Sequence, residues 1–144
     1  MKSQFHAIAV GAAERIRAWP GIPAEVGVCA YERGDGESEI ERSVEVVGLA
    51  VIVLPFEPVH ALDGSYPAFY DDAELIVHVV ENPRANTTGV DGSYLRDQVA
   101  LALGGTDLEG LLAAPLSEHR ISRADDGDLT IREMTWKAAA QLTE

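Results

Sequence analysis

The chain has 144 residues, a length typical of one compact domain with a single core, and we treat residues 1–144 as one domain. It contains 24 Asp and Glu against 11 Lys and Arg, a net charge of −13 at neutral pH. So negative a field argues against proteins that grip nucleic acid or anionic membranes, although DNA could pass by without being held. Cys29 is the only cysteine, so an intrachain disulfide is excluded, and its apolar neighbours predict a buried structural thiol.

Hydrophobic patterns and turn residues predict two principal helices and five strands. Phe5, Ile8, Ala12 and Ile16 recur at helical spacing, so the N-terminal segment is expected to remain in the protein as an amphipathic helix and not to act as a leader. The expected helices are 3–18 and 92–103, and the expected strands are 25–32, 43–54, 73–81, 117–124 and 128–137. This order, α-β-β-β-α-β-β, indicates an α+β fold with a mainly antiparallel or mixed sheet and helices packed on it.

Three further expectations concern residues 33–39, 43–54 and 55–70. Residues 33–39, "RGDGESE", are expected to form a solvated turn, and residues 55–70 to be irregular. The near-continuous apolar run 43–54 is expected to be an interior strand covered on both faces, because an exposed edge of that composition would aggregate.

The C-terminal strands should pair as a hairpin around "ADDGD", a tight turn that contains glycine. In its second strand, Leu129 and Ile131 alternate cleanly with polar residues. Met134 and Trp136 are apolar as well but lie out of phase with that pair. We therefore expect a β-bulge between the two pairs, near residues 132–133.

Residues 79–105, "VVENPRANTTGVDGSYLRDQVALALGG", have the strand, polar loop and helix order with which many enzymes bind phosphate or build a nucleophile elbow. Phosphate binding of that kind needs glycines beside the phosphate, usually with a lysine. The loop has no lysine, its only basic residue is Arg84, and Glu81 and Asp91 would repel an anion. A G-x-S-x-G elbow is also absent. We therefore expect neither catalysis nor cofactor binding from this loop.

The remaining titratable residues suggest no site. His6, His60, His78 and His119 fall in different expected elements, and no pair has the i, i+4 spacing of a helical metal site. The acids of "RADDGD" lack the spacing and the distal glutamate of a calcium loop. We expect no cofactor and no enzymatic activity. One alternative stays open, a small ligand-binding or enzymatic α+β domain whose scattered site would include His78 or His119 with acids.

The loop carries a pattern in which a strand ends in E-N-x-x-x-N, a T-G pair follows and an amphipathic helix comes next. The residues concerned are Glu81, Asn82, Asn86, Thr88 and Gly89, followed by Leu95 to Leu103. Together with the helix-first α+β order, this pattern resembles the tail-terminator (tail-completion) proteins of tailed bacteriophages and prophages. The closing hairpin is similar in kind to the final two strands of that family.

The resemblance implies a structural virion protein that caps the finished tail tube as a ring, expected to be hexameric, and joins it to the head. Its partners would be further copies of itself, the tail tube protein and head–tail connector proteins. DNA would only pass through the lumen, and no membrane would be involved. The protein would act in the host bacterial cytoplasm during assembly and remain in the virion tail. Another head–tail connector or a baseplate component on the same fold is the second alternative.

On this hypothesis the loop is a docking element and not a catalytic turn, although a simple solvated connection is also open. The candidate docking residues are Asn82, Arg84, Asn86, Thr87, Thr88 and Gly89. Asn and Thr side chains donate and accept hydrogen bonds without titrating near neutral pH, and Arg84 could bridge to an acid of the next subunit. Gly89 would let the backbone turn into the helix. Alanine at Arg84 and Asn86 is then expected to remove assembly and to leave the melting temperature unchanged.

Overall fold

A computed structural model of the chain describes residues 4–31, 37–54 and 69–141. Its elements are, in order, α1 Gln4–Ala18, β1 Gly27–Ala30, α2 Glu37–Arg42, the π-helix η1 Ser43–Val47, β2 Leu49–Val53, β3 Phe69–Glu81, α3 Gly92–Leu103, β4 Ala114–Asp126 and β5 Leu129–Gln141. The α+β class is confirmed, with the two expected principal helices at α1 and α3. The irregular segment expected at 55–70 lies outside the described residues except for its last two, which begin β3.

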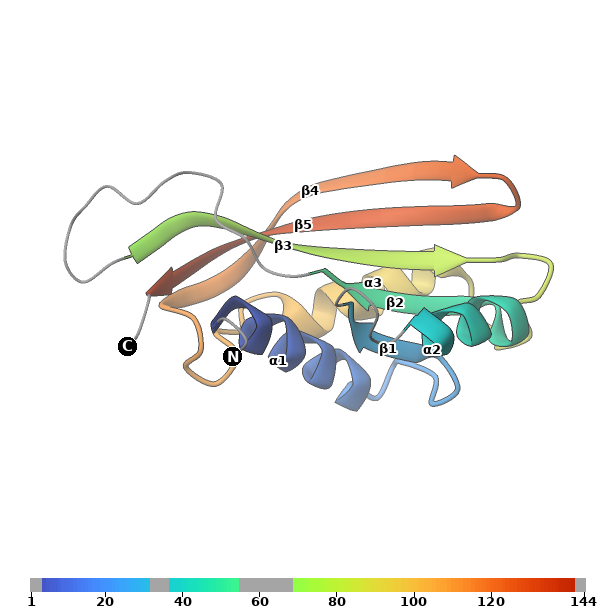
Figure 1. Cartoon of the computed structure of the whole chain (residues 1–144), viewed down its shortest axis with the longest axis horizontal. Coiled ribbons are helices and arrows are strands. Elements are labelled where there is room, and N and C mark those ends of the chain that lie inside the picture. The colour runs from blue at the N-terminus through green and yellow to red at the C-terminus, as the bar shows by residue number, and fades with distance from the viewer. Residues whose placement is uncertain (1–3, 32–36, 55–68, 142–144) are drawn as a thin grey trace.

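The five strands form one mixed sheet in the order β1-β2-β3-β5-β4 (Figure 1). Only β1 and β2 run parallel, and the other three neighbouring pairs are antiparallel. β4 and β5 are joined by a tight turn in which Gly127 has φ +62°, a conformation that costs glycine little. The order leaves β1 and β4 as the two outer strands, at opposite edges of the sheet.

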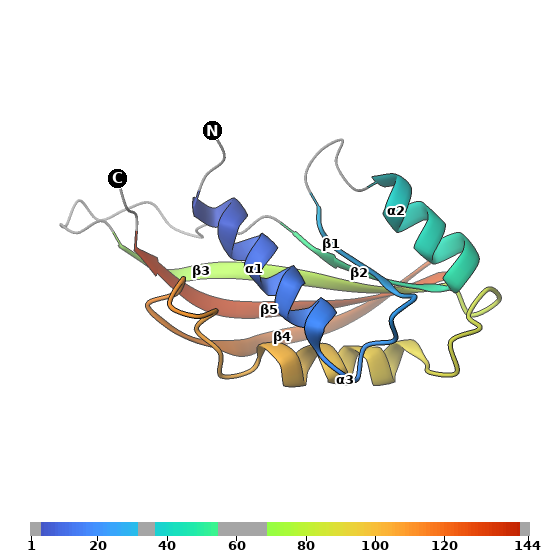
Figure 2. The same cartoon turned by 90° about the horizontal axis from the view of Figure 1, so that it is seen from below.

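One face of the sheet carries the main core, under α1 and α3 (Figure 2). The register places Val51 of β2 beside Val79 of β3, and Leu75 of β3 beside Trp136 of β5. These side chains are fully or almost fully buried, as are the apolar residues that α1 and α3 turn toward them. Burial of this apolar area is the main stabilising contribution to the fold.

The short helix α2 covers the opposite face, and only at the β1–β2 edge. A Cβ added at Gly27 of β1 would meet the side chains of Ser43 and Glu39, which places this helical segment directly over the strand. β2 therefore has helices on both of its faces and strands on both of its edges. The thiol of Cys29 is buried, as predicted, and its pKa is raised by burial first and by Glu39 second, while Arg17 acts in the opposite direction.

The apolar run 43–54 is an interior strand only in its second half. β2 begins at Leu49, whereas residues 43–47 form the π-helix η1, which ends at Gly48 with φ +92°. The prediction of strand for residues 43–48 was wrong because a serine hydroxyl decides the local structure. Ser43 Oγ accepts the Gly27 N–H at 2.8 Å and donates to the Leu49 carbonyl, which holds the chain wound at this point. The expected turn at 33–39 is wrong for residues 37–39, which begin α2.

The bulge expected near residues 132–133 is absent from β5. Its pairing with β3 runs without a shift from Thr130 to Ala138, and Met134 and Trp136 simply face α1 and α3 while Ile131 faces the other way. The irregularities lie instead in β3 between residues 70 and 73, and in β4 between 114 and 117 and between 118 and 120. A run of apolar residues on both faces of a strand can thus reflect two partly covered faces and needs no bulge.

Amide hydrogen exchange should separate the two halves of the apolar run. We expect the amides of Leu49 to Val53 to exchange only through global unfolding, because both edges of β2 are paired. The amide of Val46, whose side chain is exposed, should exchange earlier through local opening of η1. Exchange followed by NMR checks this, with Ser122 of the outer strand β4 as an internal reference. Exchange of Val51 as fast as that of Ser122 would contradict the fold.

Candidate functional site

The loop between β3 and α3, residues 82–91, lies at one end of the sheet. In Figure 1 it emerges beside η1 and points the same way as the β4–β5 turn. Asp91 ends the loop as the N-cap of α3, because its Oδ1 accepts the Tyr94 N–H at 2.8 Å. The loop is thus held at both ends by regular structure, and its own side chains determine what lies between.

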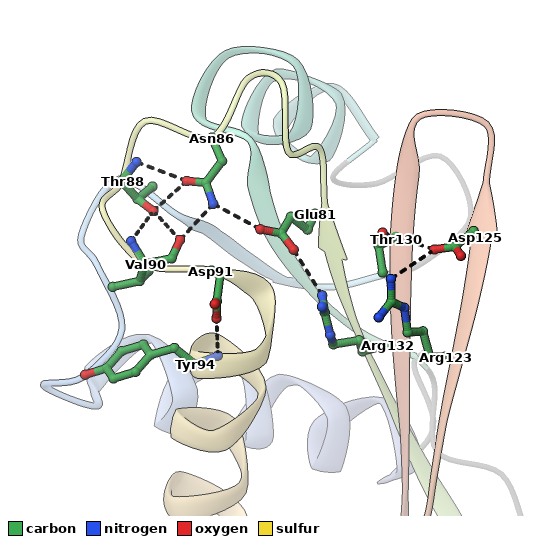
Figure 3. A network of polar contacts seen from close by, with 10 residues as sticks. All are labelled: Glu81, Asn86, Thr88, Val90, Asp91, Tyr94, Arg123, Asp125, Thr130 and Arg132. Atoms are coloured by element: carbon green, nitrogen blue, oxygen red, sulfur yellow. Dashed lines mark hydrogen bonds and ion pairs between the residues drawn. The ribbon is translucent and has the colours of Figure 1, made fainter.

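Asn86 is the centre of the loop (Figure 3). Its Nδ2 donates to the Val90 carbonyl at 2.7 Å and to Glu81 Oε2 at 3.2 Å. Its Oδ1 accepts the backbone N–H of Thr88 at 3.0 Å and the Thr88 hydroxyl at 2.7 Å. The carbonyl oxygen and one amide hydrogen of Asn86 therefore bond within the loop, and its other amide hydrogen bonds Glu81 at the end of β3.

Glu81, the last residue of β3, connects the loop to the sheet. Its Oε1 pairs with Arg132 Nη1 of β5 at 3.1 Å, and both side chains are almost fully buried. A Cβ added at Gly92 would lie 2.2 Å from Arg132 Nη1 and 2.8 Å from Glu81 Oε1, so the first residue of α3 packs against this ion pair. Glycine at position 92 leaves the space that the pair occupies.

The loop also rests on the turn before β2. The Asn82 N–H donates to the Gly48 carbonyl at 2.9 Å, and the Thr87 N–H donates to the Val47 carbonyl at 3.4 Å. A Cβ added at Gly48 would lie 2.3 Å from the backbone N and Cα of Asn86. Gly48 is therefore required twice, for its positive φ and for the close approach of the loop.

The structure divides the six predicted docking residues into two groups. The side chains of Asn86 and Thr88 form their hydrogen bonds within the loop and with Glu81. Asn82 is half-buried, and its Oδ1 accepts no hydrogen bond from the described residues. Arg84 and Thr87 point outward. The Arg84 side chain is 83 % exposed, and its only described ion pair, to Asp128 at the β4–β5 turn, is long at 3.9 Å.

Gly89 also lies on the surface, and its φ of +86° is the turn that the sequence predicted. The sequence missed Arg132 and Gly48, which hold the loop from outside. A signal for Gly48 was present, since a glycine that interrupts a run of valines often marks a special backbone conformation.

A second candidate site lies on the other face of the sheet. His78 Nε2 is 2.9 Å from Glu133 Oε2 on the neighbouring strand, and a hollow of about 410 Å³ opens beside it. The hollow is lined by Tyr31, Glu37, Ile40, Glu41, Ile52, Leu54 and His78. It has an apolar floor and an acidic rim, but within the described ranges no three His, Cys, Asp or Glu side chains are arranged to hold a metal. His119 of β4 is not among the residues that line the hollow, and His60 lies outside the described residues.

Comparison with known proteins gives a match at the level of fold. The chain is similar to a chain in the solved structure titled "Virion of native gene transfer agent (GTA) particle", with a TM-score of 0.59 and 18 % sequence identity over 94 % of this chain and 96 % of that one. At this identity the likeness shows a shared fold. No protein-family model matches the sequence, and no curated protein matches it. Among the helices in the described parts of the chain, none is long and apolar enough to cross a membrane.

Asn86 and Arg84 should respond differently to alanine. Asn86→Ala removes the hydrogen bonds that shape the loop and leaves Glu81 with one partner fewer, so we expect a loss of about 1–3 kcal/mol in the free energy of unfolding. Arg84→Ala removes one exposed, long ion pair and should change the stability by less than about 0.5 kcal/mol. Urea unfolding of the two variants measures both values. Equal stability of the two variants would contradict a structural role for Asn86. The present prediction replaces the expectation from the sequence that alanine at either position leaves the melting temperature unchanged.

Two glycines form a matched pair for the contact with the loop. Gly48 and Gly89 have nearly the same φ, +92° and +86°, but a Cβ at Gly89 would meet nothing within 4 Å. Gly89→Ala should therefore cost only the backbone strain, about 1 kcal/mol. Gly48→Ala adds a clash with the backbone of residues 85 and 86 and should cost about 3 kcal/mol or more. Thermal unfolding compares them, and similar losses for the two variants would contradict the close approach.

Proposed function

We propose that this chain is a structural component of a phage-type virion and that it acts as a tail terminator. The observation that carries the proposal is the likeness of fold to a chain of a gene transfer agent virion, which extends over 94 % of this chain and 96 % of that one. The E-N-x-x-x-N and T-G pattern of the loop supports it independently. A shared fold alone does not determine function, so the assembly itself has to be tested.

In this role, copies of the chain close into a ring, hexameric on the resemblance to terminators, on the end of the tail tube. The ring contacts the tail tube protein on one side and head–tail connector proteins on the other. DNA passes through its lumen, and the net charge of −13 favours passage over adhesion. Assembly takes place in the host cytoplasm, and the protein remains in the virion tail. None of these steps requires catalysis.

The exposed part of the docking loop is suited to contact another virion protein. Arg84 and Thr87 offer hydrogen-bond donors at the surface, and the bonds of Asn86 and Thr88 hold the backbone beneath them. A preorganised loop loses little conformational entropy when it binds, which strengthens association. We therefore assign the docking role to Arg84 and Thr87, with Asn82, Asn86, Thr88 and Gly89 as the framework that presents them.

Two alternatives remain distinguishable. A different head–tail connector or a baseplate component would assemble on another virion protein and not on the tail tube. A ligand-binding domain is favoured by one observation, the hollow of about 410 Å³ beside His78 and Glu133. In that case a small molecule would bind to the isolated subunit, and His78→Ala would weaken the binding without affecting any assembly.

Self-association should increase with added salt. The repulsion between copies that each carry −13 acts over long distances and is screened by salt, so moderate salt should shift the 15.5 kDa subunit toward a ring. Sedimentation velocity at rising NaCl concentration, alone and with tail tubes, measures this, and electron micrographs show whether rings or capped tubes form. Arg84→Ala should reduce capping while the melting temperature is kept. A monomer at every salt concentration that also leaves tubes uncapped would contradict the terminator role.

A further inference from the structure

The two edges of the sheet expose different charged side chains. At one edge, residues 37–47 contain four glutamates and one arginine, and all four of these carboxylates are exposed on α2 and η1. At the other edge, β4 contains two arginines and one histidine, together with Glu118 and, at its end, Asp125 and Asp126. We call the first the acidic surface, made of Glu37, Glu39, Glu41 and Glu45, and the second the basic strip, made of Arg120 and Arg123.

The basic strip has hydrogen-bonding capacity left for a partner. The guanidinium of Arg120 is 4.0 Å from Glu133 and that of Arg123 is 3.6 Å from Asp125, and both arginine side chains are more than half exposed. Such long, exposed pairs contribute little and leave most of the N–H donors in water. The one glutamate of this part of β4, Glu118, is already bound to Arg96 of α3 at 3.2 Å. The two guanidinium groups therefore remain exposed donors for a partner that carries carboxylates, and Asp125 and Asp126 bound the strip at the end of β4.

Each surface also exposes a large apolar side chain. Ile121 lies between the two arginines in sequence and is 51 % exposed; it shares a face of β4 with Arg123, whereas Arg120 points to the other face, toward Glu133. Val46 follows Glu45 and is 63 % exposed. An apolar centre with a charged rim is the usual composition of a protein–protein interface. The two guanidinium groups and Ile121 on one surface thus match the carboxylates and Val46 on the other.

The basic strip is suited to side-chain contacts and not to the addition of another strand. Among the described residues β4 pairs on one side only, with β5, and residues 117–126 are all exposed. The register shift between Glu118 and Arg120 and the two arginines are features that prevent strand pairing at a free edge. A helix that presents carboxylates is therefore a better partner for this edge than another β-strand.

The position of the two surfaces decides the symmetry of the contact. The basic strip lies on one outer strand, and the acidic surface lies over the β1–β2 edge at the other side of the sheet (Figures 1 and 2). A two-fold contact through either surface would place like charges together, whereas a head-to-tail contact pairs opposite charges. Head-to-tail contacts are also the kind that closes a ring.

From these observations we infer that the partner of the basic strip is the acidic surface of a second copy of this chain. The geometry assigns the subunit contact of the ring to Arg120, Ile121 and Arg123 of one copy and Glu41, Glu45 and Val46 of the next. This inference rests on the proposed function, because it specifies the interface by which the proposed ring closes. The docking loop belongs to neither surface, although it rests on the end of η1 beside the acidic surface, and its exposed Arg84 and Thr87 are the residues assigned to the tube or the connector.

Charge reversal on each side provides the test. R120E/R123E and E41R/E45R should each weaken self-association about tenfold or more, measured by sedimentation under the salt condition in which the wild type assembles. The pair also separates this interface from general repulsion. E41R/E45R makes the net charge of −13 less negative, so general repulsion alone predicts stronger association for this variant. All four side chains are exposed, so the melting temperatures should stay near that of the wild type.

Mixing the two variants completes the experiment. The reversed strip of one variant meets the reversed acidic surface of the other, so an equimolar mixture should associate where neither variant does alone, and the fourfold variant should recover self-association. Val46→Ser should also weaken association, whereas Leu101→Ser, at a residue of α3 that is 61 % exposed and outside both surfaces, should not. A wild type that never assembles would overturn the proposed function and this inference together. Assembly of the wild type with unchanged association of both reversal variants, or with no recovery in the mixture, would overturn this inference alone.

Discussion

The buried ion pair between Glu81 and Arg132 links three parts of the chain, namely β5, the loop and the start of α3. A buried carboxylate without a partner is costly, so Glu81 has to keep both of its oxygens bonded. One oxygen binds Arg132 on β5 and the other binds Asn86 in the loop. Because the first residue of α3 packs against the same pair, the Glu81 side chain links β5, the loop and the start of α3.

Much of the fold follows from periodicity in the sequence. α1 and α3 were predicted because their apolar residues recur at a helical spacing, β3 because of its apolar run, and β4 and β5 because a turn that contains glycine lies between them. The π-helix η1 could not be predicted in this way. Its valines favour a strand locally, and the contact that overrides them joins Ser43 to Gly27, which lies 16 residues earlier in the chain.

The candidate site was predicted only in outline, for a similar reason. The composition of the loop indicated a polar, exposed turn. Its bounds were predicted correctly, because β3 ends at residue 81 and α3 begins at residue 92. It could not indicate that Asn86 and Thr88 bond inward while Arg84 points outward, because Asn, Thr and Arg suit either role. The partner of Glu81 is 51 residues away in sequence, and only the register of β3 against β5 brings the two together.

The two outer strands are finished in different ways. β1 has four residues, is covered on both faces, and has its Val28 carbonyl bound by the Arg17 guanidinium. β4 has thirteen residues, and almost all of them are exposed. A sheet with one closed edge and one open edge is asymmetric. An assembly that uses only the open edge therefore has a defined polarity. This asymmetry is a property of the fold and is independent of the charges that lie on it.

The hydroxyl of Ser43 also has a consequence for how the chain folds. It stands between Gly27 and Leu49, where a direct backbone hydrogen bond would normally begin a parallel pair. The antiparallel strands β4 and β5 are joined by a tight turn and can pair early, because closing a short loop costs little entropy. We expect the pairing of β1 with β2 to follow, because it needs η1 to place the hydroxyl. If the Ser43 contact forms after the rate-limiting step, Ser43→Ala accelerates unfolding and leaves the folding rate almost unchanged in stopped-flow experiments.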